Sequence, residues 1–98
     1  FTGFLDIMER IPSIDEVLMD PDGAEVPEAQ DVAVLYALTA ALAKKATKEN
    51  VGKVFQYLKR LPEEFGGFCA KAMLHRDKNL GRTKAFTAYA VNNQDVLL

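Results

Sequence analysis

The clearest alternation of apolar and polar positions in the chain runs from Thr47 to Asp77. Two amphipathic stretches meet there at Leu61-Pro62. The first has apolar residues at helical spacing, with its lysines off the stripe: Val51, Val54, Phe55 and Leu58. The second repeats the spacing with Phe65, Phe68, Cys69, Ala72 and Met73. Because proline cannot continue a helix but suits the first turn of the next one, the pattern predicts a central antiparallel helical hairpin.

Local signals mark the ends of these two helices. Thr47 is expected to cap the first helix with its hydroxyl. Glu63-Glu64 would lie at the positive N-terminus of the second helix. Gly66-Gly67 interrupts the second helix, at a cost of about 0.8–1 kcal/mol for each glycine relative to alanine. Such a pair indicates close helix–helix contact, a local kink or a hinge, and we favour contact or a kink over the hinge.

The sequence before the hairpin also predicts helices. An amphipathic helix is expected over residues 1–11, ending before Pro12, with inward residues Phe1, Phe4, Leu5, Met8 and Ile11. Ser13 and Glu16 have the spacing of a capping box at the start of a short helix. Asp20-Pro21-Asp22-Gly23 is typical of a turn. Glu28 to Ala46 is expected to be the longest helix, and its two adjacent apolar stripes predict a position at the centre of the bundle.

After the hairpin, a loop is expected from Asp77 to Arg82, followed by a last helix capped by Thr83 with Phe86, Tyr89 and Ala90 inward. Asn92-Asn93 ends that helix, and an apolar tail follows at Val96, Leu97 and Leu98. No stretch has the sustained period-2 alternation of a strand. We therefore predict one all-α domain over residues 1–98, a compact bundle of about five to six short helices.

Composition and charge narrow the class of protein to which the chain can belong. The chain has 98 residues, 49% of them hydrophobic, and a net charge of −2, as expected for a folded globule. The longest uncharged run, Val32 to Ala43, is too short to span a membrane. A single cysteine favours a reducing, cytoplasmic setting. Residues 1–31 carry nine acids and one base, whereas residues 32–98 carry five acids and eleven Lys or Arg. Either the acidic part packs on the basic part, which we favour, or the charges form a partner surface.

Candidate chemistry is sparse. The glycine-rich phosphate loop is absent, so we expect no nucleotide or other cofactor to bind this chain by itself. Cys69, His75 and Asp77 are too few and too widely spaced for a zinc site, and Cys69 falls on the apolar stripe of a buried helix. The acid pairs Asp15-Glu16 and Glu63-Glu64 both occupy helix first turns, where capping explains them. We therefore assign no catalytic, cofactor-binding or metal-ligating residue.

The remaining candidate is a basic stretch that could form an interaction surface: Lys71, Arg76, Lys78, Arg82 and Lys84. We favour a simpler explanation, that these residues are a solvated face or the mate of the acidic part. We rank a protein contact above binding to nucleic-acid phosphates.

Several motifs in order resemble the C-terminal region of bacterial MoxR-type AAA+ ATPases. They comprise Ile11-Pro12 with residues 14–18, Asp20-Pro21 with Val26-Pro27, residues 35–38 with 41–43, Tyr57-Leu58 with residues 61–65, Ala85-Phe86, and residues 95–98. The resemblance covers nearly the whole chain, and it implies a non-catalytic helical fragment that follows an ATPase core.

The parent protein would bind ATP and Mg²⁺ upstream and form a homo-oligomeric ring with chaperone-like activity. It would often work with proteins that carry von Willebrand factor A domains. None of the family's nucleotide-binding residues has a counterpart here. The fragment would pack on its own ATPase core or on a neighbouring subunit. A stand-alone protein-binding adaptor is the main alternative, with nucleic-acid binding after it.

Overall fold

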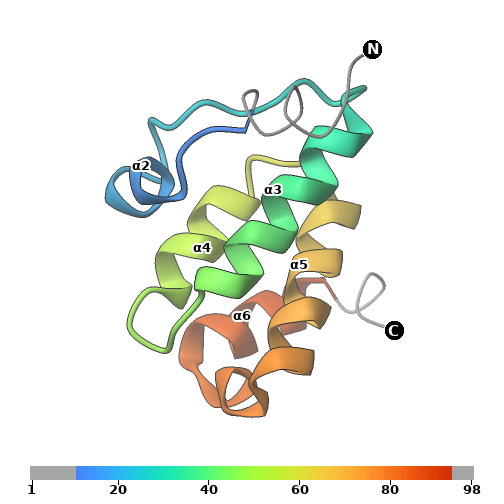
Figure 1. Cartoon of the computed structure of the whole chain (residues 1–98). Helices are drawn as coiled ribbons and strands as arrows, with labels where there is room; N and C mark the ends of the chain where they lie inside the picture. The colour runs from blue at the N-terminus through green and yellow to red at the C-terminus, as the bar shows by residue number, and fades with distance from the viewer. Residues whose placement is uncertain (1–10, 94–98) are drawn as a thin grey trace.

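In the computed structural model of the chain, residues 11–93 are described, and every regular element in that range is a helix. The elements are α2 (Ile14–Met19), α3 (Val32–Lys45), α4 (Val51–Leu58), α5 (Glu63–Arg76), the 3₁₀ helix η1 (Lys78–Arg82) and α6 (Lys84–Asn92) (Figure 1). The all-α prediction is confirmed. Of the helix predicted for residues 1–11, only Ile11 is described, and it is not helical; the rest of that helix and the tail at 96–98 lie outside the described residues.

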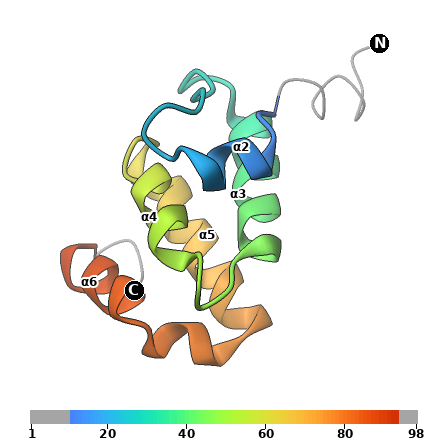
Figure 2. The same ribbon diagram turned by 90° about the vertical axis from the view of Figure 1, so that its left-hand side faces the viewer.

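Three helices form the body of the molecule. α4 and α5 run antiparallel, as the hairpin prediction requires, and α3 lies alongside them (Figure 2). α3 and α5 run parallel: the Tyr36 ring contacts the rings of Phe65 and Phe68 early in both helices. Arg76 meets the carbonyls of Ala43 and Ala46 at their far ends. α2 packs on α3 and α4, and η1 and α6 close the other end.

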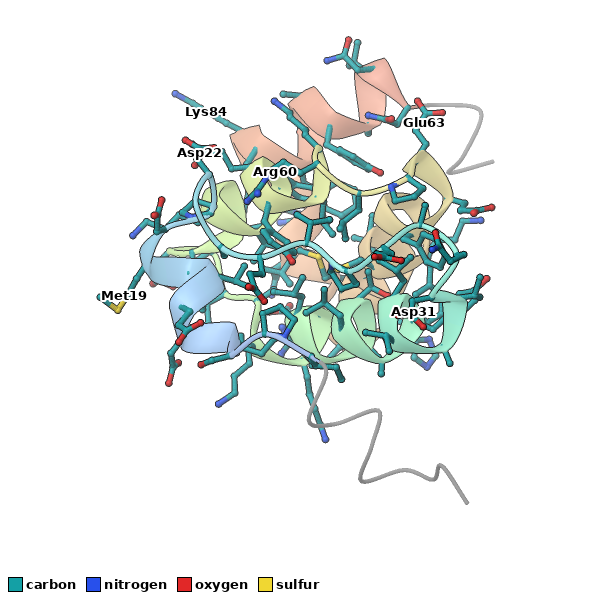
Figure 3. The ribbon with its side chains drawn as sticks, turned by 90° about the horizontal axis from the view of Figure 1, so that it is seen from above. Met19, Asp22, Asp31, Arg60, Glu63 and Lys84 are labelled. Carbon is teal, nitrogen blue, oxygen red and sulfur yellow. The ribbon has the colours of Figure 1, made fainter. Side chains whose placement is uncertain are left out.

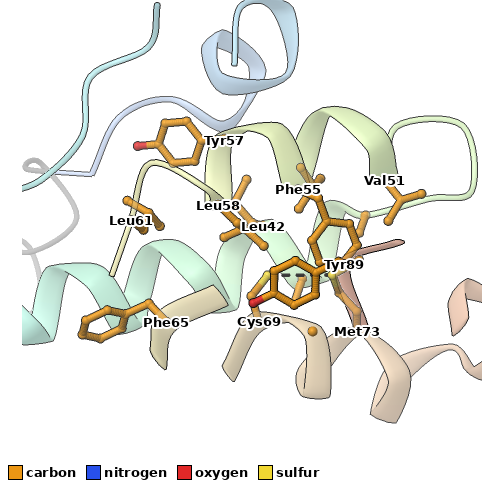
Figure 4. Close-up of a cluster of buried hydrophobic side chains, with 14 of the residues drawn as sticks. Leu42, Val51, Phe55, Tyr57, Leu58, Leu61, Phe65, Cys69, Met73 and Tyr89 are labelled. Atoms are coloured by element: carbon orange, nitrogen blue, oxygen red, sulfur yellow. Dashed lines mark hydrogen bonds between the residues drawn. The ribbon is translucent and has the colours of Figure 1, made fainter. Parts of the chain in front are cut away.

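The core lies between α3, α4 and α5 and is completed by α6 (Figure 4). The stripe predicted for α4 is buried throughout, and Tyr57 beside it is buried as well. From α6, Phe86 and Tyr89 pack against Phe55, with Tyr89 stacked on the Phe55 ring at a centroid distance of 4.5 Å. Phe55 therefore joins the hairpin to the last helix.

α3 differs from its prediction in extent and position. It begins at Val32 rather than Glu28, because the Asp31 amide bonds the Glu28 carbonyl in a turn. With 14 residues it equals α5 in length. It buries one broad face that includes Leu35, Leu38 and Leu42, whereas Val32 and Tyr36 on its outer side are exposed. The expectation that this helix occupies the centre of the bundle was wrong.

The buried face of α5 also differs from the predicted stripe. Phe65, Cys69 and Met73 are buried as expected, but Phe68 is exposed and Ala72 only half-buried. Gly66 and Gly67 are buried instead. A Cβ atom added to Gly66 would lie 2.5 Å from the Tyr89 hydroxyl oxygen. This spacing supports the close-contact interpretation at Gly66, since only a residue without a side chain lets the tyrosine approach so closely.

Of the three predicted caps, only the one at Thr83 forms as expected. The Thr47 hydroxyl accepts a hydrogen bond from the Asn50 amide (3.2 Å), and the Asn50 side chain accepts one from the Thr47 amide (2.7 Å). These bonds close the turn before α4, whose N-cap is Asn50, so the prediction that Thr47 caps this helix was wrong. The Thr83 hydroxyl accepts a hydrogen bond from the Phe86 amide at the start of α6. The prediction of a capping box at Ser13 was wrong, because Ser13 precedes α2 without a side-chain cap hydrogen bond.

The segment from Asp77 to Arg82 is not a loop. It forms the 3₁₀ helix η1, and the Asp77 carboxylate accepts a hydrogen bond from the Asn79 amide at 3.0 Å. Leu80 on η1 is buried, so the element is anchored to the core as well as capped. The prediction from Asn79 and Gly81 missed it because both residues are more often found in turns.

Candidate interaction surfaces

The five cations of the predicted basic stretch are all exposed, but one of them already has a structural role. The Arg76 guanidinium donates from Nε to the Ala43 carbonyl at 3.0 Å and from Nη2 to the Ala46 carbonyl. These carbonyls belong to the last turn of α3 and the residue after it, which carry the negative end of the helix dipole. Arg76 thus fixes the end of α3 to the end of α5.

Of the other four cations, only Arg82 shares a surface with Arg76. Lys71 lies on α5 one turn after Phe68, whereas Lys78 and Arg82 are on η1 and Lys84 begins α6. Arg76 and Arg82 line a groove of about 580 Å³ between the turn after α3 and the segment around η1. We call it the basic groove. Its lining residues are Ala46, Thr47, Lys48, Glu49, Arg76, Asp77, Asn79, Leu80, Arg82 and Thr83.

The basic groove includes a cation that the sequence analysis did not assign to any site. Lys48 comes from the turn between α3 and α4, and it lies on the wall opposite η1. Lys44 and Lys45, at the end of α3, bring two more exposed cations to the same end of the molecule. This grouping could not be predicted from the sequence, since residues 44–48 and 76–84 are brought together only by tertiary packing.

The acidic N-terminal part lies at the other end of the molecule. α2 and the linker to α3 lie across the end where α5 begins, away from η1 (Figures 1 and 2). The linker is held by two side chains. Arg60, just after α4, lies near the turn at Asp22 and donates to the Pro21 carbonyl at 2.8 Å (Figure 3). Tyr57, on α4, donates to the Glu25 carbonyl. The described part of residues 11–31 does pack on residues 32–98, through α3, α4 and Arg60. It does not cover the basic stretch, because η1 and the end of α5 lie at the other end of the molecule.

A second exposed surface is apolar. Val32 (48% exposed), Tyr36 (45%) and Phe68 (38%) lie on the outer side of α3 and α5, and we call them the aromatic face. The Tyr36 ring meets the Phe68 ring edge-on at 5.0 Å and the buried Phe65 ring at the same distance. Tyr36 is therefore held in place by core packing while nearly half of it remains exposed to solvent.

The remaining reactive groups are buried or isolated. Cys69 is fully buried and its thiol contacts the Met73 sulfur at 3.8 Å, and burial raises the pKa of the Cys69 thiol to about 12 (Figure 4). A thiol with so high a pKa is a weak nucleophile. His75 is exposed near the end of α5. Residues 11–93 contain no cluster of three His, Cys, Asp or Glu side chains suited to a metal ion.

Two tyrosine hydroxyls differ in their surroundings. Burial raises the pKa of Tyr57 to about 12, an effect that Glu25 reinforces and the nearby Arg60 opposes. The Tyr89 hydroxyl is buried and has no hydrogen-bond partner in the part of the chain that the structure describes. Burial, together with Cys69 and Glu63, raises the pKa of Tyr89.

Among the helices between residues 11 and 93, none combines the length and apolar character needed to cross a membrane. Comparison with known proteins identifies no relative: no protein-family model, no curated protein sequence and no solved structure matches the chain.

Proposed function

We propose that the chain is a non-catalytic helical domain that acts by binding protein, as the C-terminal region of a cytoplasmic MoxR-type AAA+ ATPase. In this role it packs on the ATPase core or on a neighbouring subunit and transmits nucleotide-driven movement. The observation that carries the binding part of the proposal is the aromatic face. Two large rings and a valine, gathered from two parallel helices, form the kind of exposed apolar patch that marks an interface.

The family part of the proposal rests on the ordered motifs that resemble MoxR-type C-terminal regions. In that setting ATP and Mg²⁺ bind to the upstream core, the parent forms a homo-oligomeric ring, and a protein with a von Willebrand factor A domain is a candidate partner. The aromatic face belongs to the same proposal because the motif at residues 35–38 contains Tyr36. The same helix places Leu35 in the core and Tyr36 on the surface. Binding of a partner at Tyr36 can therefore be coupled to the packing of the core.

Binding of the chain to the ATPase core encoded in front of it tests the proposal. We expect a complex of the two purified proteins in calorimetric titration, weakened about tenfold or more by the double substitution Tyr36→Ser with Phe68→Ser. The matched control is Met19→Ser with Val91→Ser, which removes two exposed apolar side chains elsewhere and should bind as the unmodified chain does. Circular dichroism of both variants checks that the fold is retained.

Two outcomes would count against the proposal. If the core does not bind the chain, the packing role is wrong. If it binds but the two double variants weaken the complex equally, the aromatic face is not the contact.

A stand-alone adaptor is the second candidate, and the separation of charge into two ends favours it. A free-standing domain with an acidic end and a basic end can bridge two partners of opposite charge. In this case the chain would bind no ATPase core, and its binding would fall steeply as salt is added.

A further inference from the structure

We propose that the aromatic face binds the aromatic face of a second copy of this chain, with the two α3 helices antiparallel. The pairing rests on the part of the proposed function in which Val32, Tyr36 and Phe68 bind protein. It identifies a partner for that face and the direction in which the partner lies.

The outer side of α3 carries no charged side chain for three turns. Every residue of the chain between Asp31 and Lys44 is uncharged. The exposed residues of this stretch are all apolar or aromatic: Val32, Ala33, Tyr36 and Ala40. Their spacing places them on one face of the helix. With Phe68 beside them on α5, they form a continuous strip rather than scattered exposed residues, and such a strip marks a contact with another molecule.

The large and small residues of this strip are arranged to fit a copy of themselves. Tyr36 and Ala40 are one turn apart on α3. A twofold axis that crosses α3 midway between them places each Tyr36 ring on the Ala40 methyl group of the other copy, so that a large side chain meets a small one. Because α5 runs parallel to α3 and the Phe68 ring contacts the Tyr36 ring, the same axis passes close to Phe68. It therefore brings the Phe68 rings of the two copies together, as aromatic rings prefer.

Charges at the rim of the aromatic face favour the antiparallel direction. Glu28 precedes α3 and Glu64 lies in the first turn of α5, whereas Lys44 and Lys71 lie further along the same two helices. All four side chains are exposed. Antiparallel pairing brings Lys44 toward Glu28 of the other copy and Lys71 toward Glu64 of the other copy. It also sets the α3 helix dipoles in opposite directions, whereas parallel pairing would bring like charges together.

The size of the aromatic face predicts a weak dimer. α3 has 14 residues, which makes it about 21 Å long. α5 lies beside it, so the face is two helices or about 20 Å wide (Figures 1 and 2). A contact of about 400 Å² on each copy is at the small end for protein interfaces. We therefore expect a dissociation constant of about 10–100 µM.

Sedimentation velocity of the whole chain, from about 5 to about 500 µM, tests the pairing. We expect a monomer–dimer equilibrium, and Tyr36→Ser with Phe68→Ser should raise its dissociation constant about tenfold or more. The matched control is Met19→Ser with Val91→Ser, which removes exposed apolar side chains elsewhere and should dimerise as the unmodified chain does.

Two charge-reversed variants test the direction of pairing. Lys44→Glu with Lys71→Glu brings like charges together in the antiparallel dimer, and so does Glu28→Lys with Glu64→Lys. Each variant alone should dimerise about tenfold or more weakly, whereas an equal mixture of the two restores every pair of opposite charges and should dimerise as the unmodified chain does. Lys53→Glu with Lys59→Glu is the control for the first variant, because it reverses the same charge at exposed positions on and directly after α4 and should leave the dimer unchanged. Circular dichroism checks that each variant is folded.

Three results would overturn the inference: a chain that stays monomeric at every concentration, equal weakening in a double variant and its control, or a mixture of the charge-reversed variants that stays monomeric. A monomeric chain that still binds the ATPase core through Tyr36 and Phe68 overturns this pairing alone and leaves the proposed function standing. A dimer with the expected responses that binds no core supports the pairing and counts against the ATPase role.

Discussion

Replacing Gly66 with alanine tests whether α5 and α6 are in the close contact that the structure shows. The added Cβ would lie 2.5 Å from the Tyr89 hydroxyl oxygen, 3.4 Å from Cζ and 3.7 Å from Cε2. The ring cannot easily move away, because it is stacked on Phe55 at 4.5 Å. Only the hydroxyl is too close; the carbon atoms of the ring are near ordinary contact distance.

The expected change in the free energy of unfolding is the difference between two opposing effects of the substitution. Alanine gains about 0.8–1 kcal/mol over glycine inside a helix. Inserting a methyl group into a packed site costs about 1–3 kcal/mol. The Gly66→Ala chain should therefore lose about 0–2 kcal/mol of unfolding free energy. In a Tyr89→Phe background the obstructing oxygen is gone, so the same substitution should instead stabilise the fold by about 0.5–1 kcal/mol.

Four chains complete a double-mutant cycle: the unmodified protein, Gly66→Ala, Tyr89→Phe and the double variant. Their urea unfolding, followed by circular dichroism, gives the coupling free energy between Gly66 and Tyr89. We expect a coupling of about 1–3 kcal/mol. Gly52→Ala is the matched control, because a Cβ there meets nothing within 4 Å, and it should stabilise both backgrounds by about 0.5–1 kcal/mol. A coupling of zero would refute the contact and return Gly66 to the hinge interpretation.

Four further predictions follow from the core and the caps. Phe65→Ala or Phe55→Ala should cost about 3–5 kcal/mol of unfolding free energy in urea titrations, and an unchanged stability would show that these rings are not core. Arg76→Gln should cost about 1–3 kcal/mol through the lost bonds to the end of α3, with no loss expected if those bonds are absent in solution. Cys69 should not react with Ellman's reagent at pH 8 unless urea is added; rapid labelling of the folded chain would contradict its burial. Stability should hold below about pH 9 and fall toward pH 12, because the unfolded chain ionises Cys69 near its ordinary pKa of 9.0 and Tyr57 near 10.0, whereas both pKa values are about 12 when folded. Constant or rising stability over that range would contradict both assignments.

The elements of the fold were largely predictable from the sequence because their signals are local. The stripe from Val51 to Leu58, the break at Leu61-Pro62 and the cap at Thr83 each depend on residues within one or two turns. The predictions failed where tertiary packing decides. Phe68 fits the helical spacing of the α5 stripe, yet it lies at the edge of the contact with α3 and meets Tyr36 on the outside.

The candidate surfaces were harder to predict than the helices. The basic stretch was visible as a run of cations, but the sequence could not show that Arg76 binds the end of α3 or that Lys48 lies across from Arg82. The aromatic face was hidden for a related reason. Tyr36 and Phe68 are 32 positions apart, and their exposure depends on which side of α3 faces the core. Apolar residues at helical spacing do not reveal which of them stay on the surface.

We have proposed that this chain is the helical C-terminal region of a MoxR-type AAA+ ATPase. The measurement that tests it most directly is the coding sequence in front of the codon for Phe1. If the proposal is right, an in-frame ATPase module with a Gly-x-x-x-x-Gly-Lys-Ser/Thr phosphate loop lies a few hundred codons upstream, roughly the length of one or two domains. An upstream reading frame without such a loop would contradict the proposal and favour the adaptor, whose two charged ends would be the first surfaces to test.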